Sequence, residues 1–435
     1  MMIRIALFLL ALATPLRAEI AIQEVTSPGG IKAWLVEDHG IPFTALEIRF
    51  QGGTSLDAPG KRGAVNLMTA LIEEGAGEFD SQGFAAARDA LAAEFSFGSD
   101  QDGVSVSARF LTENRDQAMA LLQQALVAPR FDQVAVDRVR GQVLAGLRND
   151  EKDQGAIAGG LARARTFGDH PYATVGDGTM ASVTALTRDD IVAAFGASVA
   201  RDRITVAAAG DITATELGAL LDRVLGDLPA TGAVQPGKAE MMVKAGVKVQ
   251  DFPGPQSVIL FGHGGIRFDD PDYFAATLLN EIFGGGRFGA RLMTEVREKR
   301  GLTYGIGTGL ASYDHAESLV GQFQASNDKT AEAIEVIRAE WAKIATEGVT
   351  EDELATAKTY MTGSYPLRFD GNGTIASILV GMQVMGLAAD YPKTRNARVE
   401  AVTMADMKRV AARLFQPGDL AFIVVGQPVG VTPTE

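Results

Sequence analysis

The chain has 435 residues, a formal net charge of −14 at pH 7, 46% hydrophobic residues and 22% charged residues. This composition predicts ordinary globular folding into more than one domain. The acidic excess is spread along the chain, which argues against nucleic acid as a partner because phosphate binding needs a basic stripe. The chain has no cysteine, which excludes disulfides, thiolate catalysis and cysteine-based metal sites.

The N-terminal segment is typical of an export signal. Residues 1–18 contain Arg4, an apolar run over 5–13, Pro15 and the small residue Ala18, after which we expect cleavage. The apolar run is much shorter than the roughly 20 residues of a membrane-spanning helix, so export is favoured over a membrane anchor. We therefore expect an exported protein, periplasmic or extracellular, without a transmembrane segment.

The chain contains an internal repeat. Residues 45–59 and 257–271 each consist of an apolar strand, two glycines and an Asp-x-Pro turn, at a constant offset of 212 positions. Residues 186–211 and 402–427 match at an offset of 216, each with a capping threonine, an amphipathic helix and a buried strand ending in glycine. The repeat predicts two copies of one structural unit.

The predicted fold class is α+β, with two homologous domains. Strands of period-2 patterning alternate with long alanine-rich helices, so each domain should be a mainly antiparallel sheet with helices packed on one face. The predicted N-terminal domain covers 19–227, a Pro-, Gly- and Ala-rich linker covers 228–245, and the predicted C-terminal domain covers 246–435. Long helices are expected at 82–94, 115–126 and 132–150.

Few residues in the sequence suit hydrolytic or metal chemistry. No histidine has another three or four residues away, so no helix presents two imidazoles on one face; the four are His39, His170, His263 and His315. Each is expected to be structural, and a zinc site assembled from distant segments remains an open alternative. The sequence has no Gly-x-Ser-x-Gly elbow and no phosphate-binding loop.

Residues 282–309, IFGGGRFGARLMTEVREKRGLTYGIGTG, form the most unusual segment. We expect a helix over about 287–299, a C-terminal glycine at Gly301 and a strand that begins at 302–304. The reversal at Gly301 brings Arg297 and Tyr304 toward one spot, where a guanidinium and a phenol can stabilise negative charge on a carbonyl oxygen. The alternative is an arginine favoured by the helix dipole and a half-buried strand tyrosine.

A second helix, within residues 63–77 (GAVNLMTALIEEGAG), raises a different question. Its inward positions are Asn66, Thr69 and Ala70, which have little chemistry of their own. The residues alone do not distinguish an ordinary core helix from a catalytic helix that has lost its catalytic residues.

Taken together, these segments resemble the pitrilysin/insulinase family of zinc peptidases, and within it the bacterial two-domain processing-peptidase branch. The resemblance rests on the repeat, the Gly-Gly/Asp-x-Pro turn, FGDHPYA at 167–173, and the glycine-rich loop followed by Arg-Glu-x-x-Gly-Leu-x-Tyr. It covers nearly all of the chain beyond residue 18. It implies that each domain has the metalloenzyme LuxS/peptidase-like half-ring fold.

The resemblance also implies that the zinc site is degenerate. Active members carry His-x-x-Glu-His on the first-domain helix, with two zinc ligands and a general base, and a glutamate on a later helix is the third ligand. The corresponding positions here are Asn66, Thr69, Ala70 and, in the helix at 140–151, Gly146. We therefore expect no metal and no other cofactor in this chain.

The second-domain residues of the family are retained. By resemblance, Arg297 and Tyr304 are the expected catalytic residues, and the loop glycines are the expected substrate-binding residues: Gly284, Gly285 and Gly286. Some family members are heterodimers in which one subunit has the zinc motif and the other the Arg–Tyr pair. We expect this chain to be the second kind, inactive alone, with zinc in a homologous His-x-x-Glu-His partner and an extended peptide as substrate.

Two alternatives remain open. The chain can be a catalytically inert structural or peptide-binding scaffold, or an autonomous metallopeptidase with relocated ligands. The sequence does not indicate the peptide, since an acidic surface suits basic peptides but serves solubility as well. It also leaves open which partner the chain has and whether it self-associates.

Overall fold

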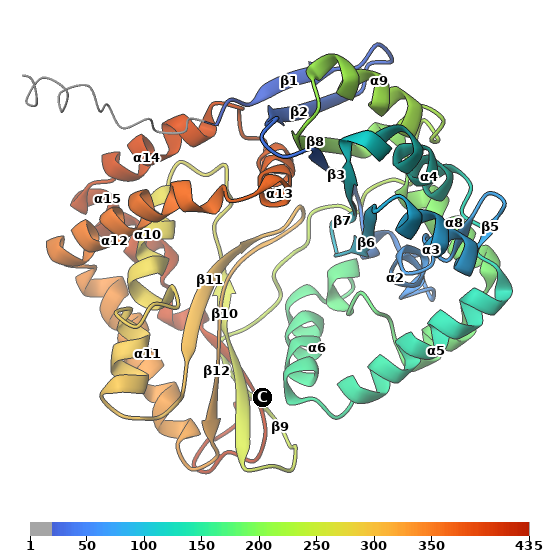
Figure 1. The fold of residues 1–435 in the computed structure, drawn as a ribbon. Helices are drawn as coiled ribbons and strands as arrows, with labels where there is room; N and C mark the ends of the chain where they lie inside the picture. The colour runs from blue at the N-terminus through green and yellow to red at the C-terminus, as the bar shows by residue number, and fades with distance from the viewer. Residues whose placement is uncertain (1–19, 435) are drawn as a thin grey trace, which may run out of the picture.

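The computed structural model describes residues 20–434, so the predicted signal peptide at 1–18 lies outside the described residues. Two large sheets, each with its own helices, form the two halves of the molecule (Figure 1). This arrangement confirms the predicted α+β fold class. Within residues 20–434, no helix combines the length and apolar character needed to cross a bilayer.

The first sheet has six strands in the order β1-β2-β8-β3-β7-β6. All neighbours pair antiparallel except β2 and β8, which are parallel. The strands are β1 (Gln23–Thr26), β2 (Lys32–Glu37), β3 (Phe43–Gln51), β6 (Glu94–Ser99), β7 (Gly103–Leu111) and β8 (Ile204–Gly210). Alternate residues of β3 (Leu46, Ile48 and Phe50) are almost completely buried against the helices of this half.

The first half has eight helices among its described residues. They are α2 (Ala64–Thr69), α3 (Ser81–Ala90), α4 (Arg115–Val127), α5 (Gln133–Asp150), α6 (Gln154–Phe167), α7 (Met180–Ala185), α8 (Arg188–Ser198) and α9 (Ala214–Leu225), with a small hairpin of β4 (Gly75–Ala76) and β5 (Phe79–Asp80). The helices expected at 82–94, 115–126 and 132–150 correspond to α3, α4 and α5. The first was predicted too long, because the chain leaves α3 after Ala90 and enters β6 at Glu94.

The second sheet has five strands in the order β11-β12-β10-β13-β9, of which β13 and β9 pair in parallel. The strands are β9 (Gly246–Gln250), β10 (Gln256–Gly264), β11 (Ile306–Ser312), β12 (Glu317–Ser326) and β13 (Ala421–Val425). The helices are α10 (Tyr273–Gly284), α11 (Thr330–Glu347), α12 (Glu351–Ser364), α13 (Asn372–Val384), α14 (Tyr391–Ala401) and α15 (Met404–Leu414), with a π-helical turn η6 (Met293–Glu298).

Each sheet also receives one helix from the other half. Helix α13 packs on β8 and β3 of the first sheet, and α6 packs on β10 and β13 of the second (Figure 1). Small residues allow this close approach: Ala376 of α13 meets Ala45 and Ala209, and Ala158 of α6 meets Val258 and Ile423. The two halves are therefore joined by helix-on-sheet packing as well as by the chain between them.

The strands of the repeat correspond in a different register from the one that the sequence match indicated. Strand β3 begins at Phe43 and β10 at Gln256, and both have nine residues, so the strands correspond at an offset of 213 rather than 212. The sequence match aligned the glycine pairs that follow the strands, and it therefore misaligned the strands themselves by one residue. A shift of one residue assigns every side chain to the opposite face of a strand.

Residues of the FGDHPYA segment close the junction between the halves. Tyr172 is fully buried, its hydroxyl donates to Asp102, and it accepts the backbone N–H of His315 at 3.2 Å. The other oxygen of Asp102 accepts the N–H of Asp314 at 3.2 Å. Burial raises the pKa of Asp102. The motif thus ties the tip of the β6–β7 hairpin to the tip of the β11–β12 hairpin.

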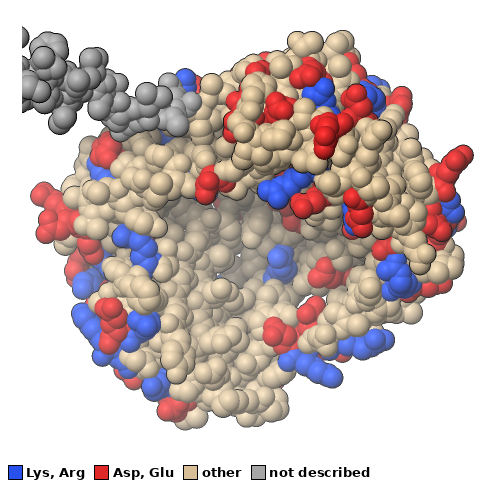
Figure 2. Space-filling view, in the orientation of Figure 1, with Lys and Arg blue, Asp and Glu red and all other residues tan. Residues whose placement is uncertain are grey.

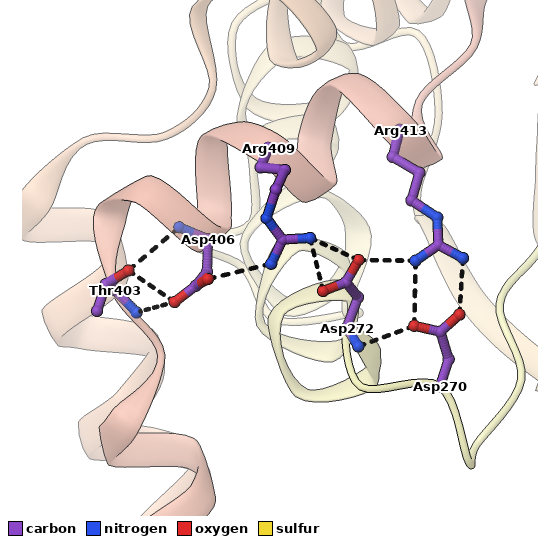
Figure 3. A network of polar contacts seen from close by, with 6 residues as sticks. All are labelled: Asp270, Asp272, Thr403, Asp406, Arg409 and Arg413. Carbon is purple, nitrogen blue, oxygen red and sulfur yellow. Dashed lines mark hydrogen bonds and ion pairs between the residues drawn. The ribbon is translucent and has the colours of Figure 1, made fainter.

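An ion-pair network fixes the second Asp-x-Pro turn to α15 (Figure 3). Arg409 donates to both carboxylate oxygens of Asp272 at 2.7 Å. Arg413 donates to Asp272 at 2.7 Å and to Asp270 at 2.6 and 3.1 Å. Because Asp272 is 8% exposed, these two arginines supply the charge compensation that its burial requires.

Candidate functional site

A groove of about 1130 Å³ lies between α6 and the face of the second sheet on which α6 packs. Helix α6 covers only part of this face. Strands β10, β12 and β11 form its floor, α6 forms one wall, and the glycine-rich turn after α10 lies at its rim. The molecule is hollowed at the centre of the face in Figure 2, where most of the surface is uncharged. The structure therefore provides an open site between the two halves.

Arg297 lies near the end of the π-helical turn η6 and is half-buried. Its Nε donates to the carbonyl oxygen of Tyr304 at 3.0 Å. Its guanidinium lies over the ring of Phe288, 4.8 Å from the centroid. A hydrogen bond at Nε and an aromatic ring on one face fix the orientation of the guanidinium. Both terminal NH2 groups remain available to donate hydrogen bonds to a ligand.

The chain reverses between these residues through a glycine. Gly301 has φ +60°, in the left-handed region that favours glycine. The N–H groups of Gly301 and Leu302 donate to the carbonyl oxygens of Arg297 and Val296 at 2.9 and 3.0 Å. The predicted role of Gly301 as the glycine that ends the helix is confirmed.

Tyr304 lines the groove and is 91% exposed. The strand expected to start at 302–304 begins only at Ile306, so that prediction was wrong, and so was the alternative of a half-buried strand tyrosine. Because pairing with β12 starts at Ile306 and Phe323, Tyr304 remains outside the sheet. Its hydroxyl forms no hydrogen bond with any other residue of 20–434.

The glycine-rich turn is shaped by packing and by backbone conformation. A side chain at Gly284 would meet Thr308 at 2.3 Å and one at Gly285 would meet Glu281 at 2.6 Å, whereas Gly286 has φ +83° and open space around it. The turn continues to residue 290 and helical structure begins at 291. The predicted helix start at about 287 was therefore wrong, because the left-handed Gly286 and the turn that follows delay it.

Phe288, which was not predicted from the sequence, is 65% exposed and covers the Arg297 guanidinium. A large aromatic residue among glycines, in GGGRFGA, is the signal that could have identified it. The sequence also did not single out Arg163 of α6, a half-buried groove residue.

The positions expected for a degenerate zinc site lie on α2 and α5, which are in contact. Asn66 is half-buried and Ala70 is exposed. Thr69 is 3% exposed and donates its hydroxyl to the carbonyl oxygen of Asn66 at 2.8 Å. Gly146 is exposed and has no side chain. These residues do not fit zinc, because they provide neither imidazole nor carboxylate.

Elsewhere in residues 20–434, no three or more histidine, cysteine, aspartate or glutamate side chains are grouped to hold a metal ion. The histidines instead make other contacts. His39 pairs with Asp211 at 2.7 Å, and His263 contacts the indole nitrogen of Trp341 at 3.2 Å. The rings of His170 and His315 lie at the junction with centroids 5.9 Å apart and planes inclined at 54°.

A buried carboxyl group orients the start of α2. Asp57 is 8% exposed and accepts the N–H groups of Gly63 at 2.8 Å and Val65 at 2.9 Å. Burial raises its pKa to about 6, against the lowering effect of these bonds and of Arg62. The first Asp-x-Pro turn thus holds α2, the helix on which the family resemblance predicts the degenerate zinc site.

Two family models match the chain. The one described as "Insulinase (Peptidase family M16)" matches residues 32–174, and the one described as "Peptidase M16 inactive domain" matches residues 185–361. The matched ranges take in most of both halves. The chain therefore belongs to the insulinase, or M16, family of peptidases.

Among curated proteins, the chain is 26% identical over 396 residues to the non-peptidase homolog YmxG of Helicobacter pylori, covering 89% of this chain and 90% of that protein. It is 24% identical over 404 residues to an uncharacterized zinc protease of Streptomyces coelicolor, covering 90% and 86%. The relatives thus include both a named non-peptidase and proteins described as proteases.

Among solved structures, a peptidase M16 inactive domain from Pseudomonas fluorescens superposes with a TM-score of 0.88 at 28% identity, covering 96% of this chain and 100% of that one. A protease from Helicobacter pylori superposes with a TM-score of 0.84 at 15% identity, covering 94% and 99%. The second likeness establishes the shared fold alone.

Proposed function

We propose that this chain is the non-zinc-binding subunit of a heterodimeric zinc peptidase and that it binds peptide in the groove beside α6. The observation that carries the proposal is the Arg297–Tyr304 arrangement: an oriented guanidinium is bonded to the backbone of Tyr304, whose exposed side chain lines the groove, while the zinc positions are lost. A homologous His-x-x-Glu-His subunit supplies the zinc.

In this proposal, Arg297 and Tyr304 act on the peptide bond from the side opposite the partner's metal. The two terminal NH2 groups of the Arg297 guanidinium and the hydroxyl of Tyr304 donate to the carbonyl oxygen as it gains negative charge. Gly286 has open space around it and leaves the rim of the groove low enough for a peptide backbone to approach, whereas Gly284 and Gly285 shape the turn because Thr308 and Glu281 leave no room for side chains there. Export through the predicted signal peptide places the pair in the periplasm or outside the cell.

A second candidate function is a catalytically inert scaffold that binds peptide or a partner without taking part in chemistry. The inactive-domain description of the matching family model and the non-peptidase relative favour it. Against it, the exposed Tyr304 and its link to Arg297 have no evident use in a scaffold. An autonomous peptidase with relocated ligands has no supporting ligand cluster in residues 20–434.

Reconstitution tests the proposal. The chain is purified alone and after co-expression with a homologue that carries His-x-x-Glu-His, and zinc content and peptide cleavage are measured for each preparation. We expect zinc and cleavage only in the co-purified pair. A pair that assembles but cleaves no faster than the zinc subunit alone would favour the scaffold function. One tightly bound zinc in the isolated chain would favour the autonomous peptidase.

A further inference from the structure

We infer that His170 is a pH-sensitive latch that holds the linker against the junction while its imidazole is neutral and releases the linker when the imidazole gains a proton. The inference joins two segments, the linker predicted at 228–245 and the FGDHPYA segment at 167–173. It does not depend on the proposed peptidase function.

Both ring nitrogens of His170 form hydrogen bonds, in opposite roles. Nδ1 lies 3.2 Å from the backbone nitrogen of Tyr172 and accepts its N–H. Nε2 lies 3.0 Å from the carbonyl oxygen of Gly237, which can only accept, so Nε2 is the nitrogen that carries the hydrogen. One acceptor nitrogen and one donor nitrogen define the neutral imidazole. The geometry therefore fixes both the tautomer and the charge of His170.

A proton on Nδ1 is incompatible with this arrangement. The cationic ring has two donors, so its Nδ1–H and the N–H of Tyr172 would point at each other across 3.2 Å. His170 caps the short helical turn η4 (Pro171–Ala173), and its ring meets the ring of Tyr172 edge-on, with centroids 4.7 Å apart. The ring has to turn to relieve the contact between the two donors, and the bond from Nε2 to Gly237 is then lost.

Gly237 is one of three successive points at which the linker is anchored. The N–H of Ala239 donates to the carbonyl oxygen of His315 at 2.8 Å, and the N–H of Met242 donates to that of Thr166 at 2.8 Å. Because the three anchors lie within six residues, the loss of the first leaves the other two more open to exchange with water.

The linker also forms part of the groove. Met241 and Val243 are among the lining residues. Ala239 is 6% exposed and belongs to an apolar cluster with Phe167 and Tyr172, against which Met241 packs. Release of the linker at Gly237 therefore loosens a segment that lines the groove.

The neighbours of His170 oppose a positive charge there. Charged and titratable groups come from the segment before α2, the β6–β7 turn, the β11–β12 turn, the linker and the chain next to His170: Arg62, Asp102, Asp314, His315, Lys238 and Asp169. Burial lowers the pKa of His170, and a positive charge on His315 and that of Arg62 lower it further, against the bond to Gly237 and the charge of Asp102.

The sign of the pH dependence follows from this direction. Histidines of the unfolded chain titrate near pH 6.5, above the folded-state pKa of His170. The contribution of the neutral ring to stability is therefore complete above about pH 6.5 and is lost as the pH falls toward the folded-state value. The linker should be held most firmly at neutral pH.

Amide hydrogen exchange of the full mature chain tests the latch. Protection factors of the Ala239 and Met242 amides, corrected for the intrinsic pH dependence of exchange, are measured from pH 7.5 to 4.5. We expect them to fall roughly three- to tenfold, the change that the net loss of one hydrogen bond produces. The ring signals of 13C-labelled histidine, assigned by substituting each of the four histidines in turn, should show His170 gaining its proton over the same range.

Two variants that cannot titrate separate the two bonds. His170→Gln keeps a donor for Gly237, so protection of the linker should stay high at every pH. His170→Asn keeps a capping oxygen for the N–H of Tyr172 but is too short to reach Gly237, so protection should be low at every pH. The matched control is His39→Gln, which removes a 55% exposed histidine of the same half and should keep the wild-type pH dependence.

A fall in protection of the same size in His170→Gln would overturn the inference, because another group, such as Asp102, would then control the linker. Constant protection in the wild-type chain while His170 gains its proton would overturn it as well. So would a His170 that stays neutral down to pH 4.5.

Discussion

The side chain of Arg297 is bonded to the backbone of Tyr304, with Nε donating to the carbonyl oxygen at 3.0 Å. Arg297 belongs to a π-helical turn and Tyr304 to the irregular chain before β11. π-Helical turns occur frequently at functional sites. The bond makes the guanidinium and the chain segment that carries the exposed phenol a single unit, so a change at Arg297 affects both.

The free energy of unfolding should depend little on the side chains of Arg297 and Tyr304. Arg297→Ala removes one hydrogen bond and one cation–π contact at a half-exposed site, which should lower the free energy of unfolding by about 1–2 kcal/mol. Tyr304→Phe removes a hydroxyl from a 91% exposed side chain and should change it by less than about 0.5 kcal/mol. Urea unfolding followed by circular dichroism measures both. A large loss for Tyr304→Phe would show that the phenol is structural.

If the expected zinc-site positions are correct, substitutions there should create a zinc site in the isolated chain. Asn66 and Ala70 are four residues apart at α2, so Asn66→His and Ala70→His place two imidazoles on one face. Gly146 lies on α5, which contacts α2, and a side chain there meets nothing within 4 Å. We expect the triple variant with Gly146→Glu to retain one zinc per chain after dialysis, measured by mass spectrometry.

The control is the double variant with Asn66→His and Ala70→His alone. It should bind zinc more weakly than the triple variant, because the third ligand is missing. If the triple variant retains no more zinc than the wild-type chain, the backbone of α2 and α5 no longer has the geometry of a zinc site. The absence of zinc binding would then have a backbone cause as well as a side-chain cause.

The stability of the junction between the halves should depend on the hydroxyl of Tyr172. Tyr172→Phe leaves a buried oxygen of Asp102 and the N–H of His315 without their partner. We expect a loss of roughly 2–4 kcal/mol in the free energy of unfolding. Tyr313→Phe is the matched control, since its ring packs on Tyr172, and should cost less than about 0.5 kcal/mol. Equal effects of the two substitutions would contradict this account.

Asp57 should make stability depend on pH. Burial raises its folded-state pKa from 3.8 to about 6, so between these values the folded protein keeps a proton that the unfolded chain has released. Stability therefore falls as the pH rises through this window, by roughly 3 kcal/mol in total. Asp57→Asn cannot ionise and should lack this dependence. The difference in the free energy of unfolding between wild type and variant, measured by urea unfolding from pH 3 to 7, should shift by that amount against the wild type. A constant difference would show that the pKa is not raised.

Local signals in the sequence were sufficient for the capped helices and for the class of fold. Thr187 and Thr403 were expected to cap helices, and both form capping boxes, with Asp190 and Asp406. These interactions involve residues three positions apart, so the sequence contains the whole motif. The alternation of strand and helix patterns gave the α+β class for a similar reason.

Features that depend on distant pairing could not be predicted. The register of the repeat was one residue out because glycines in the turns matched better than the strands, whose register is set by partners such as Gly210 opposite Thr44. The exposure of Tyr304 depends on where β11 meets β12. The bond between His170 and Gly237 becomes evident only in three dimensions, because 67 positions of the chain separate the two residues.

The most direct test of the central claim is the rate of peptide cleavage by the reconstituted pair when this chain carries both Arg297→Ala and Tyr304→Phe. Removing such donors should lower kcat by about 100-fold or more, while the double variant still co-purifies with its zinc subunit and Arg300→Ala leaves the rate unchanged. Cleavage at the full wild-type rate by an intact pair that carries the double variant would contradict the account.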